Sequence, residues 1–361
     1  MNIREIEATP FRIPFVRPLA VGGSIVEARA GILIRLHDDD GRVGLGEVAP
    51  HPLASEAVPR RLMQSVAAAQ EALRLPGPTE LDAVLDWLEV VSSPAVRAGL
   101  EMACWDLAAQ SARIPLAEML GPAARHRVPV NAIIDRLNPA DAATVAHEFV
   151  AQGFCCLKLK VGRNVREDTA RLAAVRAAAG PQVRLRIDAN GMWSLDEALR
   201  FLPQLAAYDL DYVEQPVADA AQLAQVRRAV NVPIAADECV TDAGTVQRLA
   251  ALGAADVIVV KPALLGLRAA AAVVRTAQTC GMSVVVTSAL DTSIGIAAAL
   301  HLAATLPDPV LPCGLATASL LTGDLAREPL VPRGGWLEVP RRPGLGVQLD
   351  TEMLRGMVSS P

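Results

Sequence analysis

Charged side chains end five short apolar runs of this sequence, and the spacing between the charges is nearly regular. From Lys160 onward, successive charges lie 28, 26, 23 and 24 residues apart. A strand, a helix and two loops need about that many residues, so the spacing predicts parallel strands that deliver their charges to one end of a sheet. The runs are 155–160, which carries Lys158 and Lys160, 183–188 with Asp188, 210–214 with Glu214, 232–237 with Asp237, and 256–261 with Lys261.

Three of these charges are carboxylates: Asp188, Glu214 and Asp237. Hard oxygen ligands without a neighbouring His or Cys favour Mg²⁺, with Mn²⁺ as a substitute, over zinc. Without a cation, two carboxylates about 4 Å apart at an effective dielectric of about 20 repel each other by about 4 kcal/mol. Three separate salt bridges are the alternative. Three acids in phase on consecutive strands favour a metal site.

The remaining charges are lysines. Lys158 and Lys160 lie two residues apart on one predicted strand, so their side chains point to the same side. Burying two ammonium groups is costly unless they act, and nearby cations lower the pKa of a lysine so that it can serve as a base. Lys261 arrives from four strands onward, where it could address the other face of the same carbon. The alternative is that the lysines only neutralise the acids. The set predicts abstraction of a proton α to a carboxylate, with the metal stabilising the enediolate.

Length and composition limit the protein class. The chain has 361 residues, 52% of them hydrophobic, which suits one large domain and a smaller one. Its net charge of 34 − 39 = −5, without a long basic run, argues against a nucleic-acid partner. The six cysteines form no CxxC pair, and neither a signal peptide nor a membrane-spanning stretch is evident. We therefore expect a cytoplasmic protein with no membrane partner, and a homo-oligomer is compatible with the sequence.

Two patterns divide the chain. Residues 1–125 combine strands with helices and predict an α+β unit, to which the tail, 325–361, is expected to return. From 126 to 324, strands and helices alternate, with a first strand at 128–134 and an eighth at 310–315. Strict alternation of about eight strands favours a closed (β/α)8-type TIM barrel over an open sheet. Residues 20–24 (AVGGS) are predicted to form a mobile lid, since the adjacent Gly22 and Gly23 give the backbone hinge freedom, and a plain surface turn is the alternative.

These motifs resemble the enolase superfamily and, within it, the muconate-lactonizing enzyme subgroup. The resemblance implies a modified β7α8 barrel beneath an α+β capping domain, a small-molecule carboxylate as substrate, and Asn190 and Glu238 as residues that orient the ligands and lysines. The matching segments are Lys158-x-Lys160, Asp188-Ala189-Asn190, Glu214-Gln215-Pro216, Asp237-Glu238 and Lys261-Pro262, together with 44–47 (GLGE) and 100–106 (LEMACWD).

Two further segments, 287–295 (TSALDTSIG) and 313–317 (CGLAT), resemble those of o-succinylbenzoate synthases of the menaquinone pathway. This resemblance implies a carbon–oxygen lyase that carries out the syn dehydration of 2-succinyl-6-hydroxy-2,4-cyclohexadiene-1-carboxylate. Lys160 would be the base and then the acid, Lys261 would stabilise the enediolate from the opposite face, and Lys158 would orient the carboxylate. The residues expected nearby are Ser288 and Gly314, beside the succinyl chain, and Arg186, which is either near the active site or a charge partner in the barrel interior.

Other reactions on the same scaffold are alternatives: racemisation of an N-acylamino acid, epimerisation of a dipeptide, and muconate cycloisomerisation. Dipeptide epimerases usually carry Asp-x-Asp after the eighth strand, and muconate cycloisomerases carry an acid near that position. This chain has no acid between Asp308 and Asp324. A non-catalytic metal-binding scaffold is the alternative from a different class.

Overall fold

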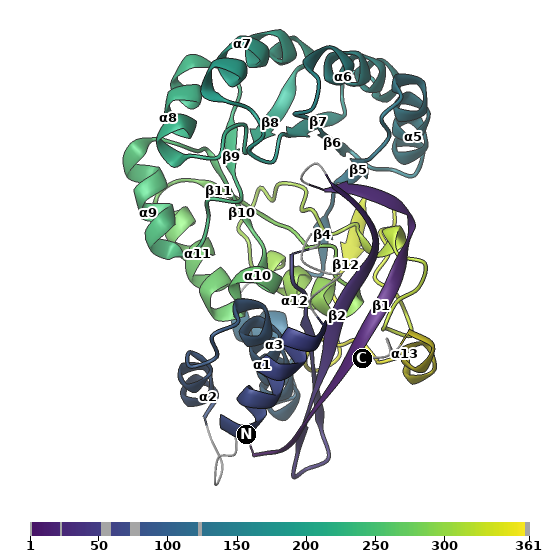
Figure 1. Cartoon of the computed structure of the whole chain (residues 1–361), viewed down its shortest axis with the longest axis vertical. Coiled ribbons are helices and arrows are strands. Elements are labelled where there is room, and N and C mark those ends of the chain that lie inside the picture. The colour runs from purple at the N-terminus through teal and green to yellow at the C-terminus, as the bar shows by residue number, and fades with distance from the viewer. Residues whose placement is uncertain (1, 22–23, 52–58, 73–79, 122–124, 358–361) are drawn as a thin grey trace.

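The computed structural model describes residues 2–21, 24–51, 59–72, 80–121 and 125–357. A curled, seven-stranded parallel sheet with helices outside it forms one part of the molecule, and a three-stranded antiparallel sheet with its own helices lies beside it (Figure 1). This arrangement confirms the predicted α/β class. The two glycines at the centre of the lid predicted at 20–24 lie outside the described residues.

The parallel strands are short and almost completely buried, because helices cover one face and the other fills the barrel. Adjacent strands in the sheet are also consecutive in the chain. In that order they are β5 (Ala132–Ile134), β6 (Cys156–Lys160), β7 (Arg184–Asp188), β8 (Leu210–Glu214), β9 (Ile234–Ala236), β10 (Val257–Val260) and β11 (Ser283–Val286).

The helices that follow these strands mostly start at a side chain that caps them. Asn138, Asn164, Ser194 and Asp242 each accept hydrogen bonds from backbone N–H groups of the first helical turn. The helices are α5 (Pro139–Ala151), α6 (Val165–Ala179), α7 (Leu195–Leu205), α8 (Ala220–Ala229), α9 (Ala243–Leu252), the short α10 (Pro262–Leu265), α11 (Leu267–Thr279) and α12 (Ser293–Ala303).

The prediction of an eighth strand at 310–315 is wrong. Cys313 and Gly314 make only single parallel bridges, to Val130 and Thr287, and so close the sheet between β5 and β11. Pro309 and Pro312 have no N–H to donate, so a continuous ladder cannot form in this segment. The barrel therefore has seven strands and one bridging segment.

The strand predicted at 128–134 is divided in two. Its first part, β4 (Arg127–Pro129), pairs antiparallel with β12 (Trp336–Glu338) from the tail, and only β5 enters the barrel. Pro129 stands at the division, where its missing N–H interrupts the pairing.

The N-terminal sheet packs on a long helix through glycines. A Cβ on Gly46 would collide with the carbonyl oxygen of Gly99, and one on Gly44 with that of Ala103. The GLGE motif therefore allows a strand to lie directly against a helix backbone. The elements of this part are β1 (Ile3–Val21), β2 (Ser24–Asp38), β3 (Val43–Val48), α1 (Pro59–Ala72), α2 (Leu81–Leu88), α3 (Pro94–Ala112) and α4 (Leu116–Leu120).

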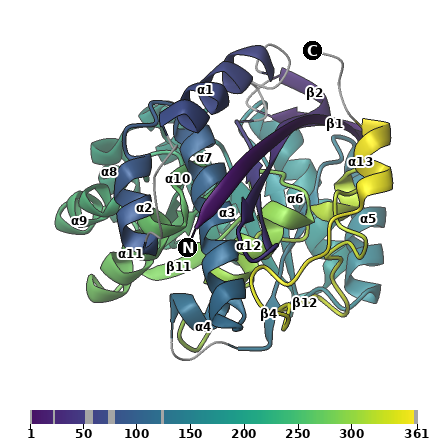
Figure 2. The same cartoon turned by 90° about the horizontal axis from the view of Figure 1, so that it is seen from below.

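The tail lies against the N-terminal part. Its helix α13 (Thr351–Met357) contacts β1, and Figure 2 shows the two side by side. Asp106 on α3 accepts hydrogen bonds from the N–H groups of Leu45 on β3 and Leu345 in the tail, both at 2.7 Å. One buried carboxylate thus ties three segments together. The exact boundaries at 125 and 325 stay predictions.

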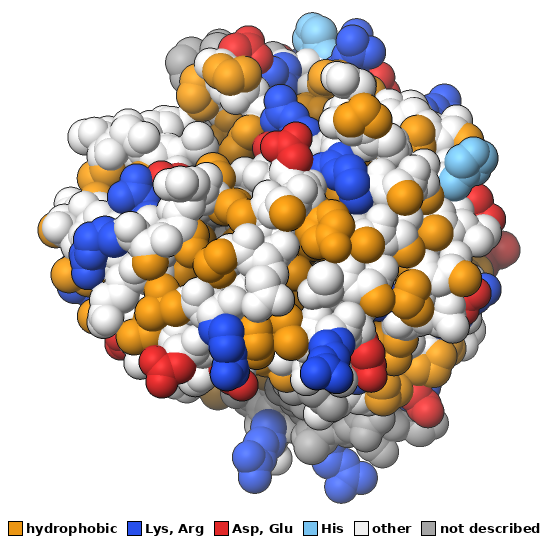
Figure 3. All heavy atoms as spheres, turned by 90° about the horizontal axis from the view of Figure 1, so that it is seen from above, with side chains coloured by type: hydrophobic (Ala, Val, Ile, Leu, Met, Phe, Trp, Pro, Cys, Tyr) orange, Lys and Arg blue, Asp and Glu red, His pale blue; other side chains and the backbone are white. Residues whose placement is uncertain are grey.

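The surface is of mixed character. On the face in Figure 3, Lys or Arg and Asp or Glu side chains of the described residues are scattered among hydrophobic ones. Among the described residues, no helix combines the length and hydropathy that crossing a membrane would require.

We expect Asp106→Ala to lower the free energy of unfolding by about 3 kcal/mol, because each of two buried N–H groups that loses its acceptor costs roughly 1–3 kcal/mol. Urea denaturation measures the change. Glu148→Ala, an exposed acid on α5, is the control and should shift it by less than about 0.5 kcal/mol. Equal effects of the two substitutions would contradict the role given to Asp106.

Candidate active site

A cavity of about 320 Å³ lies at the carboxyl ends of the barrel strands, where ligands bind in this architecture. The strand register brings the predicted charges into one layer: Lys160 lies opposite Asp188, and Asp188 opposite Glu214. Glu214 in turn lies opposite Ala235, two residues before Asp237. All six predicted ligands and lysines line this cavity, as do Asn190, Glu238, Ser288 and Gly314.

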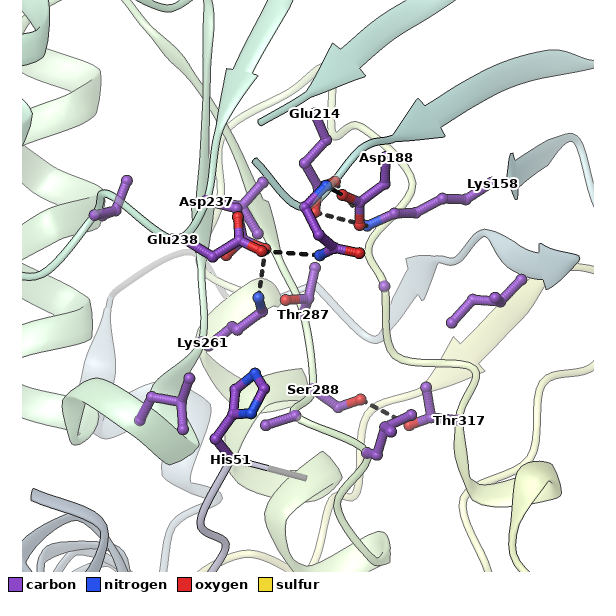
Figure 4. A pocket seen from close by; sticks show the side chains of 18 of the residues that line it. His51, Lys158, Asp188, Glu214, Asp237, Glu238, Lys261, Thr287, Ser288 and Thr317 are labelled. Carbon is purple, nitrogen blue, oxygen red and sulfur yellow. Dashed lines mark hydrogen bonds and ion pairs between the residues drawn. The ribbon is translucent and has the colours of Figure 1, made fainter. Parts of the chain in front are cut away.

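Lys158 forms the most deeply buried ion pairs of the site (Figure 4). Its Nζ lies 2.7 Å from both carboxylate oxygens of Glu214 and 2.9 Å from Oδ2 of Asp188. The Lys158 side chain is 10% exposed, and those of its partners at most 1%. Lys158 therefore bridges two adjacent strands and has little access to the open cavity.

Lys160 is more accessible, with 37% of its side chain exposed. Its Nζ lies 2.6 Å from Oδ2 of Asp188 and donates to Oδ1 of Asn190 at 2.9 Å. The other end of the Asn190 amide donates to Glu238 at 2.8 Å. Asn190 has a left-handed backbone, φ 46°, a conformation that Asn tolerates better than most residues. This turn lets one amide connect the lysine to the acid.

Lys261 pairs with Asp237 from the opposite side. The position of Asp237 is fixed by Gln215, whose Oε1 accepts its backbone N–H at 2.8 Å. Gln215 itself has φ 38°, a strained value for this residue type. Hydrogen bonds of Gln215 to Ala235 and Val217 hold this conformation. The Glu-Gln-Pro motif thus sets the geometry of the next acid along the sheet.

The buried acids and lysines of the site differ in how strongly their surroundings favour the ionised form. Burial raises the pKa of Glu214 to about 8, and Asp188 adds to this shift. Burial also opposes ionisation of Asp188, but Lys158 and Lys160 hold the pKa of Asp188 well below its usual range. Burial works against the Lys158 ammonium, yet Asp188 and Glu214 raise its pKa well above the ordinary value. Lys158 therefore stays charged, whereas Glu214 ionises less readily than an ordinary carboxyl group because its surroundings do not fully compensate a negative charge there.

Among the described residues, no three His, Cys, Asp or Glu side chains already surround a common point. Instead, the lysines form ion pairs with the oxygens of Asp188, Glu214 and Asp237. The three predicted metal ligands therefore lie in one layer, but their oxygens do not converge on one point.

The part of the cavity lining that follows β11 and crosses the barrel closure carries no charged side chain, and we call it the neutral wall. Ser288 and Thr317 share a hydrogen bond of 2.7 Å between their hydroxyl groups. Gly314 has both backbone groups engaged, its N–H with Val286 and its carbonyl with the N–H of Ser288, so it contributes space rather than a hydrogen bond. The residues of this wall are Thr287, Ser288, Ala289, Leu290, Gly314 and Thr317.

Arg186 does not line the cavity. It is fully buried two residues before Asp188, where its Nε donates to Asp211 at 2.7 Å and its guanidinium lies 4.4 Å from the Tyr212 ring centre. Of the two positions expected for Arg186, the structure supports the charge partner in the barrel interior.

The TSALDTSIG segment has a second role besides lining the cavity. The Thr292 hydroxyl donates to Glu47 of the N-terminal sheet at 2.6 Å, and the Ser293 hydroxyl to Asp324 at 2.8 Å. Asp291 lies 3.6 Å from Arg29 on β2. The first half of the motif thus forms the cavity wall, and the second half attaches the N-terminal sheet and the start of the tail to the barrel.

Sequence reasoning missed His51, Asn131, Thr287 and Thr317, which also line the cavity. Single polar residues without a spacing pattern give little signal. A stronger signal was available: Lys158, Lys160 and Lys261 are the only lysines in the chain, against 31 arginines. Arginine can carry positive charge on a surface but cannot readily lose it, so the presence of all three lysines in one cavity favours a role there that arginine cannot fill.

We expect Lys158→Met to lower the free energy of unfolding by about 3–5 kcal/mol in metal-free buffer, because it removes the buried ammonium group that Asp188 and Glu214 share. Urea denaturation with a chelator measures this. The control is Arg97→Met, which removes the more exposed pair with Glu89 and should cost at most about 1 kcal/mol. A Lys158→Met effect no larger than this would show that the buried pairs add no net stability.

Comparisons with known proteins agree with this geometry. The family model described as mandelate racemase / muconate lactonizing enzyme, N-terminal domain, matches residues 5–121, and the model described as enolase C-terminal domain-like matches 141–353. The chain is 46% identical over 230 residues to an o-succinylbenzoate synthase of Thermobifida fusca, covering 62% of this chain and 71% of that one.

Two crystal structures show the same fold over the whole chain. The dipeptide epimerase of Enterococcus faecalis in complex with Mg and the dipeptide L-Leu-L-Tyr has a TM-score of 0.90 and 28% identity, covering 96% of this chain and 100% of that one. The muconate lactonizing enzyme of Pseudomonas fluorescens in complex with muconolactone has a TM-score of 0.93 and 27% identity, covering 99% of each. The chain therefore belongs to the enolase superfamily of enzymes, in its mandelate racemase and muconate lactonizing enzyme group.

Proposed function

We propose that the chain is an o-succinylbenzoate synthase, which dehydrates 2-succinyl-6-hydroxy-2,4-cyclohexadiene-1-carboxylate in menaquinone biosynthesis. The observation that carries the proposal is the neutral wall of the cavity. A dipeptide brings an ammonium group that needs a carboxylate partner. The acids among the described residues that line the cavity lie on the charged wall, the part of the lining that carries the lysines, and none lies on the neutral wall. The identity with the Thermobifida synthase supports the same conclusion.

Asp188, Glu214 and Asp237 are the residues that would hold Mg²⁺ or Mn²⁺. Their fit to a divalent cation rests on three features: only oxygen donors, positions on adjacent strands, and a Glu214 carboxyl group whose ionisation requires more positive charge nearby. The cavity is lined by four carboxylates against three ammonium groups, so its own charges leave room for a cation. When bound, the cation would supply positive charge that offsets the negative charge developing on the substrate carboxylate.

Lys160 is the proposed base, because it is the most exposed of the three lysines and Lys158 is enclosed by two acids. Its amine takes the proton from the ring carbon next to the carboxylate, and the electron pair of that C–H bond passes to the carboxylate. The adjacent C–O bond then breaks, and Lys160 returns the proton to the departing hydroxyl. The products are an aromatic ring and one water, with no change in oxidation state overall.

The other two lysines keep their charge in this scheme. Lys158 orients the substrate carboxylate, and Lys261 stabilises the enediolate from the opposite face by a cation–π type of contact. Asn190 and Glu238 hold Lys160 in position through the chain of hydrogen bonds between them. Ser288 offers a hydroxyl to the succinyl chain, and Gly314 lines the cavity nearby without a side chain that would clash with Thr287.

Epimerisation of a dipeptide or racemisation of an N-acylamino acid is the second candidate. It is favoured by the similarity to a dipeptide epimerase over 96% of this chain. The same lysines on opposite sides of one carbon could exchange a proton without loss of water. The two candidates separate in D₂O: dehydration yields product without accumulating labelled substrate, whereas epimerisation exchanges deuterium into the α-carbon and eliminates nothing.

We expect both Lys160→Ala and Lys160→Arg to lower kcat for the dehydration by about 10²–10⁴-fold, because arginine keeps the charge but cannot act as a base. Steady-state assays measure this. Because the chain has three lysines, NMR of isotope-labelled lysine checks in each variant that the signals of Lys158 and Lys261 persist. Activity retained in Lys160→Arg would mean that Lys160 acts only through its charge.

We expect Asp188→Asn, Glu214→Gln and Asp237→Asn each to abolish most of the rise in Tm that Mg²⁺ or Mn²⁺ causes in the unaltered protein, because a cation stabilises only the state that binds it. Differential scanning fluorimetry with and without chelator measures this, and calorimetric titration gives the affinity. Glu148→Gln on the surface is the matched control. A full Mg²⁺ response in the three site variants would place the cation elsewhere.

A further inference from the structure

Two buried polar atoms in the cavity wall have no hydrogen-bond partner among the described residues. They are Nδ2 of Asn131 and Oγ1 of Thr287. Both residues line the cavity, and they are 1% and 7% exposed. A buried donor without an acceptor destabilises a fold, so two such donors at one cavity point to a ligand that brings acceptors.

The orientation of the Asn131 amide is set by Arg186. The Nη1 of Arg186 donates to Oδ1 of Asn131 at 3.4 Å and to the carbonyl oxygen of Pro312. Arginine has donors only, so the amide must turn its oxygen to Arg186 and keep its NH₂ group for another acceptor. Arg186 is itself held by Asp211 and Tyr212, which makes it a positioning residue for Asn131.

Asn131 and Thr287 flank the segment that closes the barrel. The Asn131 N–H donates to the carbonyl oxygen of Cys313 at 3.0 Å, and Thr287 bridges Gly314 on the other side. A Cβ at Gly314 would lie 2.7 Å from Cγ2 of Thr287, so the bridging segment packs directly against the Thr287 side chain. No acid of the described cavity lining stands on this wall.

We propose that Asn131 Nδ2 and Thr287 Oγ1 bind the carboxylate at the far end of the substrate's acyl side chain. A carboxylate taken into a buried site needs several donors, and the hydroxyl pair of Ser288 and Thr317 retains one proton to give as a third. The ring carboxylate is then held on the charged wall and the side-chain carboxylate on the neutral wall. This inference rests on the proposed function and names the residues that select the length and charge of the acyl chain.

Thr287→Val provides the sharpest test, because the substitution is nearly isosteric and removes no hydrogen bond made within the described protein. We expect its Tm to equal that of the unaltered protein. In calorimetric titrations with Mg²⁺ present, we expect it to bind 2-succinylbenzoate about tenfold more weakly, as one hydrogen bond to a charged group is lost. Its affinity for 2-acetylbenzoate, which has the ketone but no second carboxylate, should stay within twofold.

Asn131→Asp is the second variant. One carboxylate oxygen can still accept from Arg186, so the fold is kept, while the other replaces a donor by a negative charge. We expect a loss of 2-succinylbenzoate affinity larger than that of Thr287→Val, and a smaller loss for 2-acetylbenzoate.

Thr144→Val, on the surface of α5, is the matched control for Thr287→Val. In the dehydration assay, Thr287→Val should raise KM and leave kcat within about twofold, because Thr287 does not touch the reacting carbons.

The outcomes separate this inference from the proposed function. Unchanged affinity of Thr287→Val for 2-succinylbenzoate, or an equal loss for both ligands, would overturn the assignment of the side-chain carboxylate. An unaltered protein that binds 2-succinylbenzoate but does not form it would overturn the proposed reaction alone, and the affinity pattern would still decide the role of the two donors.

Discussion

Mutual neutralisation of buried charges is the constraint on which the rest of this structure depends. Asp188, Glu214 and Lys158 are almost completely enclosed, and none of them could stay ionised alone in so dry a place. The parallel register solves this problem by placing acids and amines in one layer at the strand ends. The barrel must therefore be closed and correctly in register before its charges are tolerable, which links the accuracy of the fold directly to the chemistry at its mouth.

Buried polar contacts connect the N-terminal sheet to the cavity. Glu47 and Arg29 reach from that sheet to residues that directly follow the cavity wall, Thr292 and Asp291. These contacts are buried, and burial together with the nearby Asp291 raises the pKa of Glu47 to about 7. A shift in how the N-terminal part sits would therefore be transmitted to Ala289 and Leu290, which line the cavity. Residues 287–295 therefore have two structural roles that are adjacent in sequence. The first half of the motif lines the cavity, and the second half binds the N-terminal sheet to the barrel.

Much of the fold and half of the site were predictable from the sequence, because strand-end charges at regular spacing report a parallel barrel directly. What failed depends on contacts between distant segments. The segment at 310–315 has the composition of a strand, but its prolines limit it to single bridges. The amide of Asn131 is oriented by Arg186, 55 residues later, which donates to its oxygen. The strained Gln215 is held by its neighbours on the next strand, which no local pattern reveals.

The division of the cavity into a charged and a neutral wall separates two tasks. Removing a proton next to a carboxylate requires the acids and amines, and these resemble a motif shared by relatives that dehydrate, epimerise or cyclise. The fate of the enediolate is decided by which atoms stand next to the reacting carbon, and that depends on how the remainder of the substrate is held. The neutral wall offers hydroxyl donors and a glycine, Asn131 beside it offers an amide donor, and none of the described residues of this wall is an acid. In the proposed function, such a wall suits an acyl chain with oxygen acceptors and disfavours an ammonium group, and in this way it would direct a common first step toward loss of water.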